Sequence, residues 1–143
     1  MTEKKLVFEA RTVDDLIAIS PSFLEQTKGK KIFAFYGDMG AGKTTFIKQL
    51  TKSMGIEEEA SSPTYGFVNE YFSPFYGKVY HFDCYRLESE EEAYDIGIEE
   101  YFYEEVYTFI EWPEKIHNLL PENTVSVKIT LGTDNERIIE VEL

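Results

Sequence analysis

The stretch that decides the fold is Ile32-Phe33-Ala34-Phe35-Tyr36, followed directly by Gly37-Asp38-Met39-Gly40-Ala41-Gly42-Lys43-Thr44. Its first five residues form an uninterrupted apolar run of strand length, which is typical of a strand buried on both faces of a sheet. The next eight match the pattern glycine, four residues, Gly-Lys-Thr, and apolar residues then recur at helical spacing from Thr44 to Met54. A glycine-rich turn between a buried strand and an amphipathic helix predicts a phosphate-binding loop.

The physics of such a loop assigns an expected role to each of its polar groups. The glycines let the backbone curl so that successive N–H groups point inward, and the following helix adds its positive N-terminal dipole. We expect Lys43 to reach the β and γ phosphates of ATP, and the Thr44 hydroxyl to ligate the Mg²⁺ that bridges them. Thr45 is expected to cap the helix or to contact the α phosphate. The nucleotide-binding residues expected here are Gly37, Asp38, Met39, Gly40, Ala41, Gly42, Lys43, Thr44 and Thr45.

Two carboxylates stand where a magnesium site that drives hydrolysis requires them, at the ends of strands beside the loop. Asp83 follows the apolar run Val79–Phe82, and Glu111 follows Tyr107–Ile110. With Lys43 they form the expected catalytic set, and with Thr44 the expected metal ligands. One carboxylate would hold the ion directly or through water and the other would orient the attacking water; the sequence does not assign these two roles.

The rest of the chain alternates strand and helix patterns around this loop. A helix is predicted from Thr12, with Asp15 three residues later, until Pro21 interrupts it. We predict an α/β protein with a small P-loop NTPase fold, a mixed central sheet flanked by helices, and residues 1–143 as one domain with Ile32–Tyr36 as its central strand. The other predicted strands are 5–10, 65–72, 78–82, 106–110, 125–131 and 137–143, and the other predicted helices are 89–97, 98–105 and 113–120.

Charge and cysteine content limit the partners and the compartment. Fourteen Lys and Arg against 27 Asp and Glu give a net charge of −13, so most of the surface should repel phosphate backbones and anionic membranes. Unaided binding to tRNA is therefore not expected. The single cysteine, Cys84, cannot form an internal disulfide, and the sequence has neither a signal-peptide pattern nor an apolar run of membrane-spanning length. A cytoplasmic protein is expected.

Several other residues permit two interpretations. Thr64 could contact the metal or the γ phosphate as part of an order–disorder switch, or be an ordinary turn hydroxyl. Arg86 could stabilise charge on the phosphates or pair with neighbouring glutamates. His81 and His117 lack metal-ligand spacing, and His81 is expected to be a strand residue without chemistry. The aromatic residues, 15% of the chain, could pack the core or form a face for a partner.

At this point the motifs resemble a known family, the bacterial TsaE (YjeE) ATPases that support threonylcarbamoyladenosine modification of tRNA. The resemblance covers roughly two thirds of the chain. It is carried by the phosphate loop, Ser62-Pro63-Thr64-Tyr65, His81-Phe82-Asp83-Cys84-Tyr85-Arg86-Leu87, Gly97-Ile98 followed by Tyr101-Phe102, and Glu111-Trp112-Pro113-Glu114. A leucine is common at the position of Cys84.

The resemblance implies more than the motifs alone. It implies that Asp83 and Glu111 complete the magnesium site, that Thr64 lies in a switch-like loop, and that Trp112 lies near the nucleotide. It also implies that the protein binds a TsaB–TsaD heterodimer and that its ATP hydrolysis resets this complex. The family's C-terminal basic residue could be Lys128 or Arg137.

Three other classes of protein remain alternatives. A small-molecule or nucleotide kinase shares the phosphate loop but needs several arginines to clamp two substrates, and this chain has three in all. A small GTPase needs an Asn-Lys-x-Asp motif, which the sequence lacks. A nucleotide-gated binding module would use ATP to order the 61–65 loop, with incidental hydrolysis.

Overall fold

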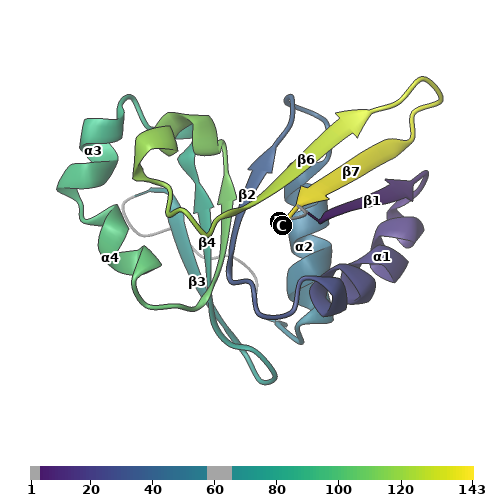
Figure 1. Cartoon of the computed structure of the whole chain (residues 1–143), viewed down its shortest axis with the longest axis horizontal. Coiled ribbons are helices and arrows are strands. Elements are labelled where there is room, and N and C mark those ends of the chain that lie inside the picture. Colours follow the sequence, from purple (N-terminus) through teal and green to yellow (C-terminus); the bar gives the residue numbers. More distant parts are fainter. Residues whose placement is uncertain (1–3, 58–65) are drawn as a thin grey trace.

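One seven-stranded mixed sheet runs through the molecule. The computed structural model describes residues 4–57 and 66–143, and Figure 1 shows the sheet in the order β1-β7-β6-β2-β5-β4-β3. The predicted class, an α/β fold with a mixed central sheet, is confirmed. The strands are β1 (Lys5–Ala10), β2 (Ile32–Tyr36), β3 (Val68–Ser73), β4 (Gly77–Asp83), β5 (Tyr107–Glu111), β6 (Val125–Leu131) and β7 (Arg137–Glu142).

β2 is the central strand, as predicted, and its neighbours bring the chemistry to one edge of the sheet. β2 pairs in parallel with β5 on one side and β6 on the other, and β5 pairs in parallel with β4. The carboxyl ends of these strands therefore point the same way, which is where ligands bind in open α/β sheets. The register sets Asp83 beside Glu111 and Phe35 beside Glu111.

Alternate residues of the buried strands supply two separate cores. Phe33 of β2 and Phe109 of β5 belong to the core that includes α1 (Val13–Gln26) and α2 (Lys43–Ser53). Ile32 and Ile110, one residue away on the same strands, belong to the core under α3 (Glu90–Asp95) and α4 (Ile98–Phe102). The uninterrupted apolar pattern of β2 follows from this burial on both faces. In Figure 1, α1 and α2 accordingly lie on one side of the sheet and α3 and α4 on the other.

The first helix differs from its prediction, because α1 runs through Pro21. Proline removes the hydrogen bond that its N–H would give to the carbonyl of Ile17, and both residues lie on the exposed side of the helix. Phe23 and Leu24, beyond the proline, are buried and hold the last turn against the core. Tertiary packing thus outweighs a local helix breaker.

Three further elements differ from prediction. The strand expected over 65–72 begins at Val68, after a turn. The helix expected over 98–105 ends at Phe102, and the one expected over 113–120 is a 3-10 helix, η2 (Pro113–Leu119), with non-helical dihedral angles at Ile116. A second short 3-10 turn, η1 (Cys84–Arg86), follows β4. Cys84 in this turn is fully buried, and burial raises the pKa of its thiol to about 12, so it acts as an apolar packing residue.

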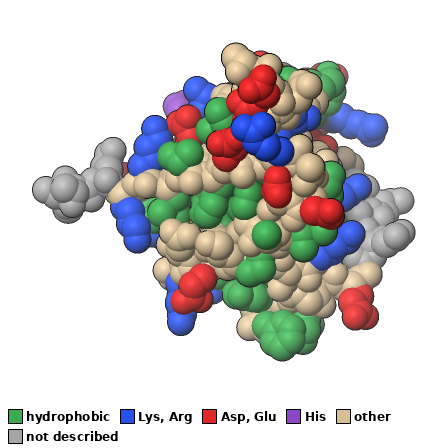
Figure 2. All heavy atoms as spheres, turned by 90° about the vertical axis from the view of Figure 1, so that its right-hand side faces the viewer, with side chains coloured by type: hydrophobic (Ala, Val, Ile, Leu, Met, Phe, Trp, Pro, Cys, Tyr) green, Lys and Arg blue, Asp and Glu red, His purple; other side chains and the backbone are tan. Residues whose placement is uncertain are grey.

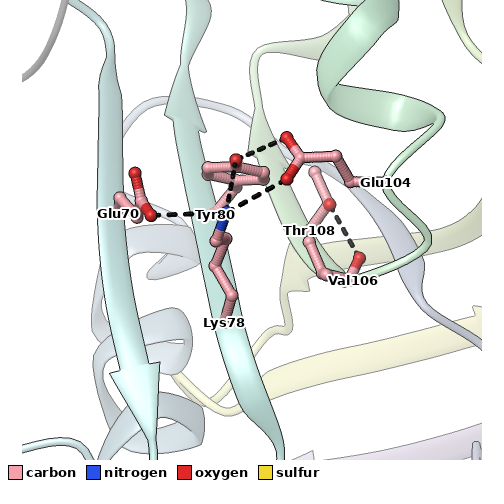
Figure 3. A network of polar contacts seen from close by, with 6 residues as sticks. All are labelled: Glu70, Lys78, Tyr80, Glu104, Val106 and Thr108. Carbon is pink, nitrogen blue, oxygen red and sulfur yellow. Dashed lines mark hydrogen bonds and ion pairs between the residues drawn. The ribbon is translucent and has the colours of Figure 1, made fainter.

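A polar network fixes β4 against its neighbours (Figure 3). The Tyr80 hydroxyl donates to Glu104 Oε2 at 2.5 Å, and Lys78 Nζ lies 3.1 Å from Glu104 Oε1 and 3.6 Å from Glu70 Oε1. Glu70 comes from β3, while Glu104 precedes β5, so the network ties three parts of the fold together. It supports the pairing that places the last residue of β4 beside the last residue of β5.

The side of the molecule that carries β1 and α1 is partly apolar. Figure 2 shows hydrophobic side chains gathered across the middle of this face, with charged side chains around them. Val7, Val13 and Ile17 are among the exposed apolar residues of these two elements. Within residues 4–57 and 66–143, the structure contains no helix long and apolar enough to cross a membrane.

Candidate nucleotide-binding site

The loop between β2 and α2 takes a conformation that its glycines make possible. A Cβ atom on Gly37 would lie 2.6 Å from the backbone oxygen of Ile129, so no other residue fits there without displacing β6. Gly42 precedes α2 in the left-handed region, at φ 103°, and has no side chain to cap the helix. The first N–H groups of α2 are thus left for an external acceptor, as in an anion site.

A cavity of about 390 Å³ opens in front of this helix end. It brings together residues that are far apart in sequence, from the loop, from the ends of β4 and β5, and from the start of β7. Its lining consists of Met39, Gly40, Gly42, Lys43, Thr44, Thr45, Asp83, Tyr85, Glu111, Trp112 and Arg137. The expected catalytic and metal-binding residues therefore lie in one place.

Lys43 is buried and is held by two contacts within the site. Its ammonium group donates to the backbone oxygen of Gly37 at 2.5 Å and lies 3.5 Å from the centre of the Trp112 ring. Burial lowers the pKa of Lys43, and the negative charges of Glu114, Glu111, Asp83 and Asp38 oppose that shift. A desolvated cation whose partners are a carbonyl and a ring face is ready to exchange them for phosphate oxygens.

Glu111 is the most constrained polar group of the site. It is 2% exposed, and each of its oxygens accepts a hydrogen bond. Thr44 Oγ1 donates to Oε1 at 2.5 Å, and His81 Nε2 lies 2.7 Å from Oε2. Burial acts to raise the pKa of Glu111, but the hydrogen bonds from His81 and Thr44, together with the charge of Lys43, outweigh it and hold the pKa below its ordinary value.

Asp83 occupies a different environment although it stands beside Glu111 in the sheet. It is exposed, and its Oδ1 accepts a hydrogen bond from the backbone N–H of Tyr85 at 3.2 Å, which caps the turn η1. Its carboxylate also faces the cavity. It can therefore meet a ligand or water without breaking a buried hydrogen bond.

Trp112 forms the wall opposite the loop. Its backbone is in the left-handed region at φ 56° and ψ 51°, a conformation that costs a non-glycine residue about 1–3 kcal/mol. The Tyr85 ring packs on it with centroids 5.1 Å apart, and Lys43 covers its face. The ring thus lines the cavity against the ammonium group, and its expected place near the nucleotide stays a prediction.

The remaining described residues expected to bind the nucleotide do not line this cavity. Thr64 lies outside the described residues, so its expected contact with metal or phosphate stays a prediction. Gly37, Asp38 and Ala41 line a neighbouring cavity of about 660 Å³, which shares Met39, Gly40 and Trp112 with the first. The loop therefore forms a wall between two hollows.

Among the basic residues, the structure places Arg137 in the cavity. Arg137 donates to the backbone oxygen of Asn135 at 2.9 Å and reaches over Gly42. Lys128 lines the neighbouring cavity, and Arg86, although close to Asp83 in sequence, lines neither. Of the two positions considered for the C-terminal basic residue, Arg137 is the one that faces Lys43 and Thr44.

Sequence reasoning missed two side chains of the site, Tyr85 and His81. Tyr85 belongs to the motif from His81 to Leu87, and the sequence assigns no role to its side chain. His81 was expected to have no chemistry, and the structure pairs it with Glu111. The sequence does show that His81 lies two residues before Asp83, and so on the same face of the strand. Predicting its contact with Glu111 also requires knowing that β4 pairs with β5.

A glycine-rich loop before the first helix of a parallel sheet core, with acidic strand ends beside it, defines the class of P-loop nucleotide-binding proteins. Comparison with known proteins narrows this class. Residues 10–139 match the family described as "Threonylcarbamoyl adenosine biosynthesis protein TsaE". The chain belongs to the TsaE family, and the resemblance indicated by its motifs is confirmed.

Individual relatives agree with this assignment. The chain is 33% identical over 136 residues to the tRNA threonylcarbamoyladenosine biosynthesis protein TsaE of Bacillus subtilis, a match that covers 95% of this chain and 84% of the relative. It is 38% identical over 138 residues to the protein of the same name from Borreliella burgdorferi, covering 95% and 98%. The crystal structure of Bacillus subtilis YdiB superimposes with a TM-score of 0.78 at 27% identity, covering 99% of this chain and 87% of that one.

Proposed function

We propose that this protein is a Mg²⁺-dependent ATPase of tRNA threonylcarbamoyladenosine biosynthesis and that the cavity between Lys43 and Glu111 is its nucleotide site. The observation that carries the proposal is the contact between Thr44 and Glu111. The Thr44 hydroxyl, next to Lys43, lies 2.5 Å from the buried carboxylate of Glu111. The contact lies at the start of α2, where the first N–H groups of the helix are left for an external acceptor. We take residues 1–143 as one ATPase domain, since a single sheet includes strands near both ends of the chain.

The residues present fit a nucleotide and a magnesium ion. The loop supplies backbone N–H groups and a lysine for phosphate, and Thr44, Asp83 and Glu111 supply the oxygen ligands that Mg²⁺ prefers. Among residues 4–57 and 66–143, no three His, Cys, Asp or Glu side chains are grouped closely enough to hold a metal ion by themselves. Magnesium typically uses one or two carboxylates together with phosphate oxygens and water, so this set suits an ion that arrives with ATP.

The chain's own residues would divide the work as follows. Lys43 leaves the Gly37 oxygen and the Trp112 ring to bind the phosphates. Thr44 and Asp83 would hold the ion, and Glu111, with its oxygens already oriented, would orient the attacking water. When bound, Mg²⁺ neutralises charge that develops on the phosphate oxygens. Trp112 and Tyr85 would keep bulk water from the reacting face.

We further propose that the protein acts in the cytoplasm on a TsaB–TsaD heterodimer rather than on tRNA directly. The family's place in tRNA modification supports such a partner, and the net charge of −13 disfavours unaided contact with a phosphate backbone. The protein would hydrolyse ATP weakly alone and faster with its partners.

Steady-state hydrolysis of Mg·ATP, measured with and without the TsaB–TsaD heterodimer of the same organism, tests this proposal. We expect a rate that requires Mg²⁺ and rises on addition of the heterodimer. Activity that ignores the heterodimer would remove the proposed partnership and keep the ATPase. No Mg²⁺-dependent hydrolysis of ATP, with or without the heterodimer, would overturn the proposal as a whole.

The kinase alternative makes a different prediction. A kinase clamps the phosphates of two substrates with several arginines, and among the described residues that line the cavity Arg137 is the one arginine. Transfer of labelled γ-phosphate to nucleosides or small alcohols, faster than release to water, would establish the kinase instead.

A further inference from the structure

Among the described residues, Thr44 and His81 contact the carboxylate of Glu111, and the proposed mechanism gives His81 no role. Its Nε2 lies 2.7 Å from Glu111 Oε2, and the two side chains are 12% and 3% exposed. Thr44 takes the other oxygen, Oε1. The two oxygens of one carboxylate are thus held by different elements, α2 and β4.

The direction of this hydrogen bond follows from the chemistry of the carboxylate. An ionised carboxylate only accepts hydrogen bonds, so the proton between the two groups belongs to His81 Nε2, whether the ring is neutral or charged. The Thr44 hydroxyl likewise donates to Oε1. Two donors aimed at two oxygens fix the plane of the carboxylate as well as its position.

Strand pairing fixes the backbone position of His81. His81 pairs with Phe109 in the register of β4 and β5, two residues before the pair formed by Asp83 and Glu111. It therefore reaches diagonally along the same face of the sheet to Glu111. The network of Lys78, Tyr80 and Glu104 ties this strand to the segment before β5 (Figure 3). The network thus fixes the strand from which the imidazole reaches the carboxylate.

We infer that His81 is a positioning residue of the nucleotide site: by holding Glu111 Oε2 it directs Oε1 toward Thr44 and the cavity. This inference rests on the proposed function and adds a residue to it. His81 itself is not among the residues that line the cavity. The alternative is a purely structural pair, in which the histidine only neutralises a buried acid.

The test compares three variants of the full-length protein. His81→Phe keeps a planar ring and loses the donor, whereas His81→Gln keeps an N–H at similar reach. His117→Gln changes the other histidine, which is exposed on η2, and serves as the matched control. Each is assayed for kcat and KM of ATP hydrolysis with the TsaB–TsaD heterodimer, for thermal unfolding, and for the affinity of a fluorescent ADP analogue with and without Mg²⁺.

We expect His81→Phe to lower kcat by about 10- to 100-fold, the range that is typical when a hydrogen-bond partner that orients a functional side chain is removed. Because Glu111 would orient the attacking water while Thr44 and Asp83 hold the ion, KM and the ADP-analogue affinity, with and without Mg²⁺, should stay within about twofold. His81→Gln should recover most of the loss, and His117→Gln should match the parent protein.

Unchanged kcat in His81→Phe would overturn the inference, as would equal losses of kcat in His81→Phe and His81→Gln. If His81→Phe does not fold, His81→Asn replaces it, because its shorter side chain cannot reach Glu111 while His81→Gln can; equal activity of these two variants would also overturn it. A parent protein that binds no nucleotide contradicts the proposed function, whereas an active parent with indifferent variants contradicts only the role of His81.

Discussion

β4 and β5 each end in a carboxylate, and the two residues pair in the sheet, but their surroundings differ. Glu111 is 2% exposed and has both oxygens occupied by side chains, whereas Asp83 is exposed and accepts a hydrogen bond from a backbone N–H. β5 lies between β2 and β4, next to the loop, and β4 lies one strand further out. The carboxylate on the strand next to β2 is therefore oriented in advance, whereas the carboxylate one strand further out can still move when a ligand binds.

This difference suggests a division of labour. A carboxylate whose oxygens are fixed before the ligand arrives costs no reorganisation when charge develops, so it suits the step where geometry matters most. A solvated carboxylate can adjust to an ion that brings its own phosphate and water ligands. The comparison therefore favours Glu111 as the orienting group and Asp83 as an adaptable metal ligand.

The largest effect expected from this contrast is on turnover. Glu111→Gln should lower kcat by about 10²–10³-fold, because it removes the negative charge and replaces one of the two acceptor oxygens by an NH2 donor, while Asp83→Asn should lower it by about tenfold. The measurement is partner-stimulated ATP hydrolysis at saturating Mg²⁺, with nucleotide affinity determined alongside. A larger loss of kcat in Asp83→Asn than in Glu111→Gln would reverse the assignment.

A smaller effect concerns stability in acid. Hydrogen bonds hold the folded-state pKa of Glu111 below its unfolded value of about 4.3, so its ionised form stabilises the fold above that pH. The contribution is lost as the pH falls through the lower, folded-state pKa. The parent protein should therefore exceed Glu111→Gln in free energy of unfolding at pH 6, by on the order of 1 kcal/mol, and the gap should narrow as the pH falls through the folded-state pKa.

Urea unfolding at a series of pH values measures this gap. Thr44→Val is the control, because it removes one donor to Glu111 and should reduce the pH-dependent part without abolishing it. A gap that stays constant from pH 6 to pH 3 would mean that the charge of Glu111 does not contribute to folding.

The smallest effect separates nearness in sequence from nearness in space. Arg137→Ala should weaken ATP binding by about three- to tenfold, since one charge-assisted contact to phosphate is lost. Arg86→Ala, three residues after Asp83 but outside the cavity, should stay within about twofold. Equilibrium binding of a fluorescent ATP analogue would decide, and a stronger effect of Arg86→Ala would mean that the turn η1 moves when nucleotide binds.

Much of the fold followed from local patterns. Alternation and turn signals gave the strands of the β3–β4 and β6–β7 hairpins, and the apolar run gave β2 to the residue. Local patterns failed where packing across the fold decides the outcome, as in α1, which continues through Pro21 because buried residues beyond it keep the helix in place. They also failed at η2, where Pro113 and the left-handed Trp112 lead into a 3-10 turn.

The sequence by itself determined the phosphate-binding loop, because its glycines, Lys43 and Thr44 are consecutive and their conformation is a local matter. It also determined that Asp83 and Glu111 end strands, since the apolar runs before them are local too. Only the tertiary structure decided that β4 pairs with β5, and hence that His81 holds Glu111 and that Arg137 reaches the cavity from the far end of the chain. The physical reason is that these contacts depend on strand order and register, which arise from the packing of distant segments.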